Sequence, residues 1–237
     1  MQIQCIWEHN GEDSLLYARD FPGAFTRGPS RDAAMRKMPS EISAYLRWKG
    51  DPLPEPFQPE IVIAQEKSSN LAIADADSDV LFDAERPPLS LPEYLAGKAL
   101  ALKSARDFLA LYQAIPERNK SCLPERATFY GPIPRTALEM YEHTKNVNDY
   151  YFGEIGVPAD HEGSIVACRE RGFALLEERM EFLSNEVRLG SYQEEWSLRK
   201  VLRRFVWHDR IHAKAMYRMA LGTFGPDAVP DVFRFQA

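Results

Sequence analysis

The chain of 237 residues is long enough for one large domain or two small ones, and its 45% hydrophobic and 27% charged residues are typical of a folded protein. A net charge of -6 argues against a nucleic-acid-binding protein with a broad basic surface. Scattered cysteines without a CxxC pair, and the lack of a long apolar run or a basic leader, predict a cytoplasmic protein without disulfides that is neither exported nor membrane-spanning.

The first 70 residues show strand patterns on both sides of one helical pattern. Residues 2–7 and the run SLLYARDF are strand-like and are separated by NGED, which predicts a hairpin. Ser30 is a candidate N-cap for a helix through residues 34–46, in which Pro39 predicts a kink or a break. The segment FQPEIVIAQEKS then returns to a strand. We therefore predict a small α/β domain at residues 1–70.

Residues 71–89 are polar and acidic, contain a Pro pair and show no sustained period, so we predict a linker with a short strand at Val80–Phe82. From residue 90 onward the periodicity is helical. Capping boxes mark two helix starts, at Ser90 with Glu93 and at Thr136 with Glu139. The predicted helices are about 90–115, 136–152, 163–185 and 197–222. In the third, the inward positions are Ile165, Cys168, Leu176, Met180 and Leu183. The predicted fold class is therefore α+β, with a four-helix bundle over residues 90–237.

The last predicted helix carries two histidines, His208 and His212, on its apolar face. At 100° per residue they share a sector with Leu198, Val201, Leu202, Phe205, Met216 and Met219. The opposite side holds Arg199, Arg203, Arg210 and Lys214, which we expect to be solvated, with binding of an acidic substrate or phosphate as the alternative. Two imidazoles four positions apart can reach one metal ion, whereas hydrogen-bonded core histidines would give the same pattern.

His143 favours the metal interpretation. It lies between Met140 and Val147 on the apolar face of the second predicted helix, where a polar side chain is costly to bury without a partner. His9, at a turn, and His161, in a loop before a helix, are expected to be solvated. The predicted metal ligands are therefore His143, His208 and His212.

The segments ALEMYEHTKNVNDYYF and EEWSLRKVLRRFVWHDRIHAKAMYRMAL resemble the second and fourth helices of the DinB family. The resemblance covers roughly residues 90–225 and includes the three histidines and Trp196 at the start of the last helix. DinB proteins are four-helix bundles that hold a divalent metal with one histidine from the second helix and two, four apart, from the fourth. The resemblance implies the same ligands here for Zn, Ni or Fe. Some DinB-like proteins are transferases or isomerases that use a low-molecular-weight thiol, which implies a thiol-dependent reaction on a small-molecule substrate.

The segment DFPGAFTRGPSRDAAMRKMPSEISAYL is similar to the strand-helix signature of HicB-like domains, which are antitoxin partners with a small sheet packed on a helix. Pro22, Gly23 and Gly28 match that pattern. Pro39 departs from it, and so does the lack of a separate helix-turn-helix or ribbon segment for DNA. We therefore do not expect a DNA-regulating role.

Three neutral imidazoles leave open positions on a divalent ion, as in catalytic rather than closed structural sites. Such an ion makes a bound water or thiol available as a nucleophile near neutral pH. The sequence indicates no convincing general base. Asp209 could orient an imidazole or accept a proton, and an ion pair is an equally good interpretation. Tyr150, Tyr151 and Trp207 could line the pocket, although plain core packing is the more common role.

Three functional hypotheses follow, in this order. The first is a metal-dependent enzyme. The second is a metal-stabilised binding or regulatory module whose HicB-like domain contacts a protein partner. The third is a structural protein with core histidines that dimerises through exposed helix faces. Helical bundles often pair, so a homodimer is expected, although the sequence indicates no interface.

Overall fold

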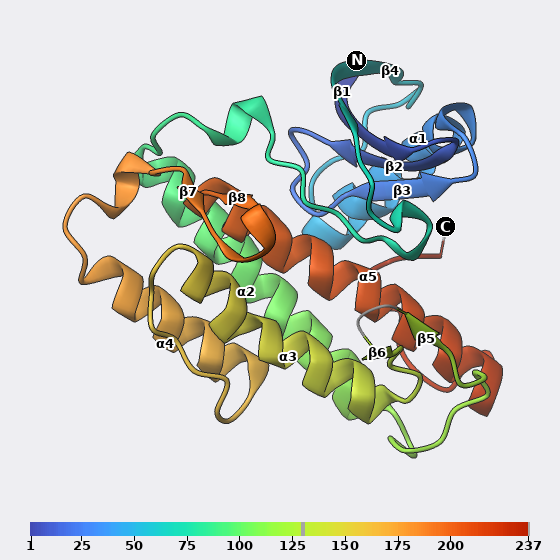
Figure 1. Cartoon of the computed structure of the whole chain (residues 1–237). Coiled ribbons are helices and arrows are strands. Elements are labelled where there is room, and N and C mark those ends of the chain that lie inside the picture. Colours follow the sequence, from blue (N-terminus) through green and yellow to red (C-terminus); the bar gives the residue numbers. More distant parts are fainter. Residues whose placement is uncertain (129–130, 237) are drawn as a thin grey trace.

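The computed structural model describes residues 1–128 and 131–236 and has a mixed α+β architecture, with a sheet in the N-terminal part and helices in the C-terminal part (Figure 1). The sheet has the strand order β3-β2-β1-β4, in which β1 and β4 are parallel and the other neighbours are antiparallel. Its strands are β1 (Gln2–Asn10), β2 (Asp13–Ala18), β3 (Phe25–Gly28) and β4 (Glu60–Ser68). The predicted hairpin and the return strand are confirmed, whereas β3 was not predicted.

Both faces of the sheet are covered by other parts of this chain. Successive side chains point to opposite faces of a strand. One face contributes Ile3, Cys5, Leu16 and Ala18 to the cluster that contains the buried side of helix α1 (Arg31–Lys49). The other contributes Ile6, Leu15, Tyr17 and Phe25 to a cluster with Trp207, Val80 and Phe82. The sheet is therefore an internal layer of the molecule.

Helix α1 continues through Pro39, so the predicted break does not occur. Ser30 caps its first turn as predicted, and the Ser30 hydroxyl accepts a hydrogen bond from the Ala33 amide at 3.2 Å. Proline removes one backbone hydrogen bond from a helix interior. Met38 and Ile42, which flank Pro39, are both fully buried in the core, and this packing holds the helix together across the missing bond.

The C-terminal part contains four long helices: α2 (Leu91–Ala114), α3 (Ala137–Glu154), α4 (Ile165–Glu177) and α5 (Leu198–Phe224). Both predicted capping boxes are present. Short elements complete the chain: β5 (Ala127–Thr128), β6 (Gly131–Pro132), β7 (Arg188–Leu189), β8 (Glu195–Trp196), and the 3-10 helices η1 (Ile73–Asp75), η2 (Asp83–Glu85), η3 (Phe182–Ser184) and η4 (Ser191–Gln193). Among the described residues, no helix has the length and apolar character needed to cross a membrane.

The predicted end of the third helix and the predicted strand at Val80–Phe82 are wrong. The third helix ends at Glu177 rather than near residue 185, and Met180, predicted to point inward, is 93% exposed. Glu181 and Asn185 adopt left-handed backbone conformations, which cannot continue a right-handed helix. The segment Val80–Phe82 is buried but pairs with no strand, so its apolar character reflects packing on the sheet rather than strand formation.

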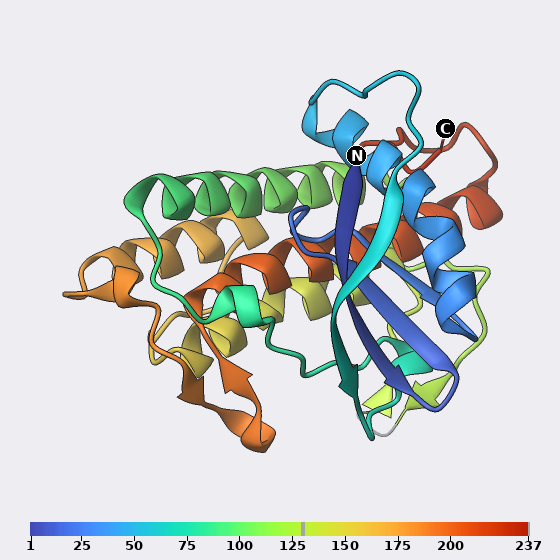
Figure 2. The ribbon, with the colours of Figure 1, turned by 90° about the horizontal axis from the view of Figure 1, so that it is seen from above.

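Helix α5 runs between the sheet and the other helices (Figures 1 and 2). Its basic side, expected to be solvated, is instead covered by the N-terminal part and the segment that follows it. Arg203 pairs with Glu85 at 3.0 Å, and Arg210 pairs with Glu41 at 2.6 Å. Acidic side chains from α1 and η2 thus neutralise a helix face that would otherwise be in water. The same carboxylate of Glu41 also binds Lys214 at 3.1 Å.

The two parts of the chain share one buried hydrophobic cluster, which includes Ile3 and Tyr45 as well as Phe205 and Met216. The loop between β2 and β3 makes a close approach to α5. Gly23 has a φ of +92°, and a Cβ at this position would lie 2.5 Å from Cγ1 of Val206. Only glycine tolerates both the backbone conformation and the contact. The PG pair of the HicB-like pattern therefore lies at the joint between the sheet and the helices.

Candidate metal centre

The structure brings the three predicted ligands together from two adjacent helices. His143 comes from α3, and His208 and His212 come from successive turns of α5. Their candidate ligand nitrogens all lie within 4.8 Å of one another. The ring centres are separated by 5.1 Å (His143 to His208), 4.7 Å (His143 to His212) and 4.5 Å (His208 to His212). Such a group can hold one ion.

The donor set fits a divalent transition metal. Zinc binds imidazole nitrogens at about 2.0–2.1 Å, which places ligands of a tetrahedral ion about 3.4 Å apart. Nitrogens that lie within 4.8 Å of one another would have to approach by up to about 1.4 Å to share such an ion. His208 Nδ1 is buried and has no hydrogen-bond partner. A buried nitrogen of this kind needs either a metal or a hydrogen-bond partner to offset its desolvation.

The site is closed on one side and open on the other. His208 is buried and His212 is half-buried, whereas His143 is exposed, which corrects the prediction that all three lie inside the bundle. The His143 ring still faces the other two imidazoles, so its environment is partly desolvated although the residue as a whole reaches solvent. An ion held here would be accessible from the His143 side.

The surroundings keep the three imidazoles neutral near pH 7. Burial lowers the pKa of His143. Burial, followed by the charges of His212 and His143, holds the pKa of His208 well below its usual range. Burial and His143 lower the pKa of His212 to about 3. Neutral imidazoles have free lone pairs, so the cluster is prepared to bind a cation without first losing protons.

Asp209 does not act on the ligands. Its carboxylate forms a bidentate pair with Arg169 of α4, at 2.6 and 3.0 Å, and both side chains are fully buried. Arg169 also donates to the Asn148 side chain on α3 at 3.0 Å and to the Ala101 carbonyl on α2 at 2.9 Å. Of the two interpretations of Asp209, the ion pair is therefore the correct one. It links all four long helices beside the site.

The remaining candidates separate into neighbours of the site and residues away from it. Tyr151 is buried, and its ring centre lies 6.0 Å from that of His208. Trp207 packs mainly toward the sheet, with Tyr17 and Phe25. The other two histidines lie apart from the cluster: His9 stacks on Trp7 and pairs with Glu66, and the exposed His161 pairs with Asp149.

Sequence reasoning missed Arg204, which lies one turn before His208 on α5. Its guanidinium group is over the rings of Trp207 and Trp196. Burial lowers the pKa of Arg204, but nearby groups, Tyr151 and Glu194 first among them, raise it above its usual value. The position of Arg204 four residues before His208 placed it on the same helix face as the histidines. Sequence analysis did not single it out because Arg199, Lys200 and Arg203 are also basic.

Comparisons of the chain with family models, with curated proteins and with solved structures found no match. The resemblances to DinB-like and HicB-like proteins therefore stay predictions. The case for the metal centre depends on the geometry of the three histidines.

The metal-free protein is expected to lose stability as the pH falls below about 6.5. Histidines of the unfolded chain take up protons near that pH, whereas folded His212, with a pKa of about 3, stays neutral. The unfolded state thus binds more protons between these values, and each such histidine lowers the free energy of unfolding by up to about 1.4 kcal/mol per pH unit. Urea unfolding at pH 7.5 and 5.0 measures this slope. His212→Gln should make it shallower, and equal slopes would contradict the assignment.

Proposed function

We propose that the protein is a metal-dependent enzyme in which His143, His208 and His212 hold one divalent ion and activate a low-molecular-weight thiol for transfer to a small-molecule substrate. The convergence of three neutral imidazoles within 4.8 Å is the observation that carries the metal part of this proposal. The thiol part follows from the resemblance to DinB-like transferases.

The arrangement of the site supports a catalytic rather than a structural ion. Structural zinc sites use four protein ligands, whereas catalytic ones use three and leave a position for water or substrate. Among the described residues, the group that can hold an ion contains these three histidines and no fourth His, Cys, Asp or Glu. The exposed His143 lies on the side from which a substrate or thiol would enter.

Each ligand contributes something different to such a site. His208 is fixed by burial and by contact with the Tyr151 ring. His212 holds the same helix face one turn further on, so the spacing of these two nitrogens is set by α5. His143 closes the triangle from α3. A bound ion would lower the pKa of a coordinated thiol and supply a thiolate at neutral pH.

The binding-module alternative is less well supported. Both faces of the HicB-like sheet are covered by this chain, through α1 on one side and through Trp207 and the 71–82 segment on the other. The edge strands β3 and β4 are the parts of this sheet that are left for a protein partner. We accordingly favour the enzyme.

A thiol-transfer assay tests the proposal. Protein purified without a histidine tag is loaded with Zn²⁺, Ni²⁺ or Fe²⁺ and assayed with 1-chloro-2,4-dinitrobenzene and glutathione, mycothiol or bacillithiol. In this reaction the thiolate sulfur bonds to the ring carbon, chloride leaves, and the thiol proton goes to solvent. We expect about one metal equivalent and a rate above the uncatalysed one that depends on metal.

The variant His143→Ala, His208→Ala should lose both metal and rate, and His161→Ala serves as the matched control. Stoichiometric metal with only the uncatalysed rate for every thiol would reject the transferase assignment while leaving the metal centre intact.

A further inference from the structure

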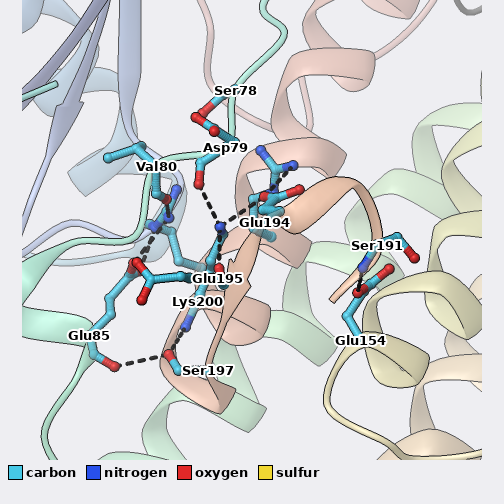
Figure 3. Close-up of polar contacts among 12 residues, drawn as sticks. Ser78, Asp79, Val80, Glu85, Glu154, Ser191, Glu194, Glu195, Ser197 and Lys200 are labelled. Carbon is cyan, nitrogen blue, oxygen red and sulfur yellow. Dashed lines mark hydrogen bonds and ion pairs between the residues drawn. The ribbon is translucent and has the colours of Figure 1, made fainter. Parts of the chain in front are cut away.

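A buried guanidinium group that shares its nearest carboxylate with a second cation lies beside the candidate metal centre. The Arg204 side chain is 9% exposed, and it shares the carboxylate of Glu194 with Lys200. Lys200 takes the closer position, at 2.8 Å, and Arg204 Nη2 lies 3.6 Å away. Lys200 also donates to the carbonyls of Asp79 and Glu195, so it is fully engaged (Figure 3). One carboxylate thus serves two cations.

The other charged groups near Arg204 already have partners. Arg203 is paired with Glu85 and donates to the carbonyl of Val80. Figure 3 shows Glu85 and Val80 on the same side of Lys200. Arg169 is paired with Asp209. Glu8 is the remaining buried carboxylate nearby, and it accepts hydrogen bonds from the Ser78 hydroxyl and the Asp79 amide. Glu8 supplies a third negative charge beside Glu85 and Glu194, so the charges balance in number, but the nearest carboxylate oxygen of Glu194 lies 3.6 Å from Arg204. An unpaired buried charge is costly unless a partner neutralises it.

Unpartnered hydrogen-bond donors gather at the same point. Arg204 Nε and Nη1 and Trp196 Nε1 are buried and have no hydrogen-bond acceptor among the residues that the structure describes. The guanidinium carbon of Arg204 lies 5.5 Å from the Trp196 ring centre and 4.7 Å from that of Trp207. In folded proteins most buried polar atoms have a partner. Glu194 Oε1 also has no hydrogen bond among the described residues, but Lys200 is already its ion-pair partner at 2.8 Å. Three donors beside a shared carboxylate can receive an anion.

This donor group lies close to the metal centre, and Trp196 packs against a residue that lines a surface pocket. Arg204 precedes His208 by one helical turn, about 6 Å along the α5 axis. Tyr151 joins the two, because the Arg204 guanidinium is 5.6 Å from its ring centre and the His208 ring is 6.0 Å from it. On the other side, Tyr150 packs against Trp196 at 5.8 Å and lines a surface pocket of about 670 Å³.

We propose that Arg204, with Trp196, binds a carboxylate group of the substrate whose reacting end lies at the three histidines. This inference deepens the proposed function and rests on it. The planar fork of a guanidinium group matches the two oxygens of a carboxylate, and such charge-assisted hydrogen bonds are among the strongest in proteins. The spacing of one turn suits a short carboxylic acid that reaches from Arg204 to an ion at His208.

Acetate binding to metal-free protein tests the inference separately from metal chemistry. At pH 7.5, thermal unfolding and tryptophan fluorescence are measured in 100 mM sodium acetate and in sodium chloride of the same ionic strength. Acetate should raise the Tm of the wild type by about 3 °C, as a ligand that binds only the native state must. It should also change the fluorescence, since Trp196 and Trp207 flank Arg204.

Arg204→Met keeps the length of the side chain and leaves Glu194 paired with Lys200, so it should fold and hold the metal but lose the acetate effect. Arg204→Lys, the second variant, retains the charge without the fork and should bind acetate at least ~10-fold more weakly. Arg218→Met, at an exposed position of α5, is the matched control and should behave as the wild type.

Two results would overturn the inference. One is a wild type that responds to acetate no more than to chloride, which would mean that the surrounding rings alone stabilise Arg204. The other is an acetate response that is equal in Arg204→Lys and the wild type. Failure of the wild type to bind metal, by contrast, would reject the proposed function. Metal binding is measured independently of acetate.

Discussion

His208→Ala is expected to weaken the binding of a divalent ion by more than about 100-fold. Mutation of a residue that only supports a metal ligand lowers the metal affinity by about 10- to 100-fold, and removal of a ligand itself should lower it further. His208 is the most buried of the three, and its ring centre lies 5.1 Å from that of His143 and 4.5 Å from that of His212. Without His208, only one imidazole from each of the two helices remains, and two ligands form an incomplete site. The affinity is measured by competition with a chromophoric chelator at pH 7.5.

The control for this experiment is His161→Ala, which removes an exposed histidine that pairs with Asp149 away from the cluster. Its metal affinity should equal that of the wild type. Because the neutral His208 ring has an unpartnered nitrogen in the metal-free protein, its removal should not unfold the chain. An unchanged affinity in His208→Ala would show that the ion binds elsewhere.

Asp209→Ala is expected to lower the free energy of unfolding by about 3–5 kcal/mol, the usual effect of removing one partner of a buried ion pair. Both Arg169 and Asp209 are 0% exposed, so the change leaves an unneutralised guanidinium in the core. The apolar double variant Arg169→Met, Asp209→Leu removes both charges and should recover most of that loss. Urea unfolding of the metal-free proteins at pH 7.5 measures all three.

The exposed pair between Arg86 and Glu195 provides the comparison, since its side chains are 44% and 47% exposed. Glu195→Ala should cost less than about 1 kcal/mol. If Asp209→Ala also lowered the free energy of unfolding by less than about 1 kcal/mol, the Arg169–Asp209 pair would not be needed to hold the helices that carry the ligands.

The sequence was informative wherever the structure is determined by neighbouring residues. Helix periodicity placed His208 and His212 on one face, and capping boxes at Ser90 and Thr136 located two helix starts. The convergence of His143 with them needed an additional assumption, namely that the two helices pack side by side. That assumption came from the composition of their apolar faces and from the DinB-like resemblance.

The sequence did not indicate features that depend on contacts between residues far apart in the chain. The basic side of α5 was expected to be solvated because Glu41 and Glu85, which neutralise Arg210 and Arg203, lie more than a hundred residues away. The role of Asp209 was open for the same reason, since its partner is on another helix. Met180 was misplaced because helical periodicity does not show that the helix ends at Glu177, before the left-handed Glu181.

X-ray absorption spectroscopy of the zinc-loaded protein tests the metal centre most directly. We expect about three imidazole nitrogens at about 2.0–2.1 Å, together with one or more oxygen ligands from solvent. His208→Ala, loaded with the same ion at high concentration, should show fewer imidazoles. A shell of oxygen or sulfur ligands without imidazole scattering in the wild-type protein would contradict the account.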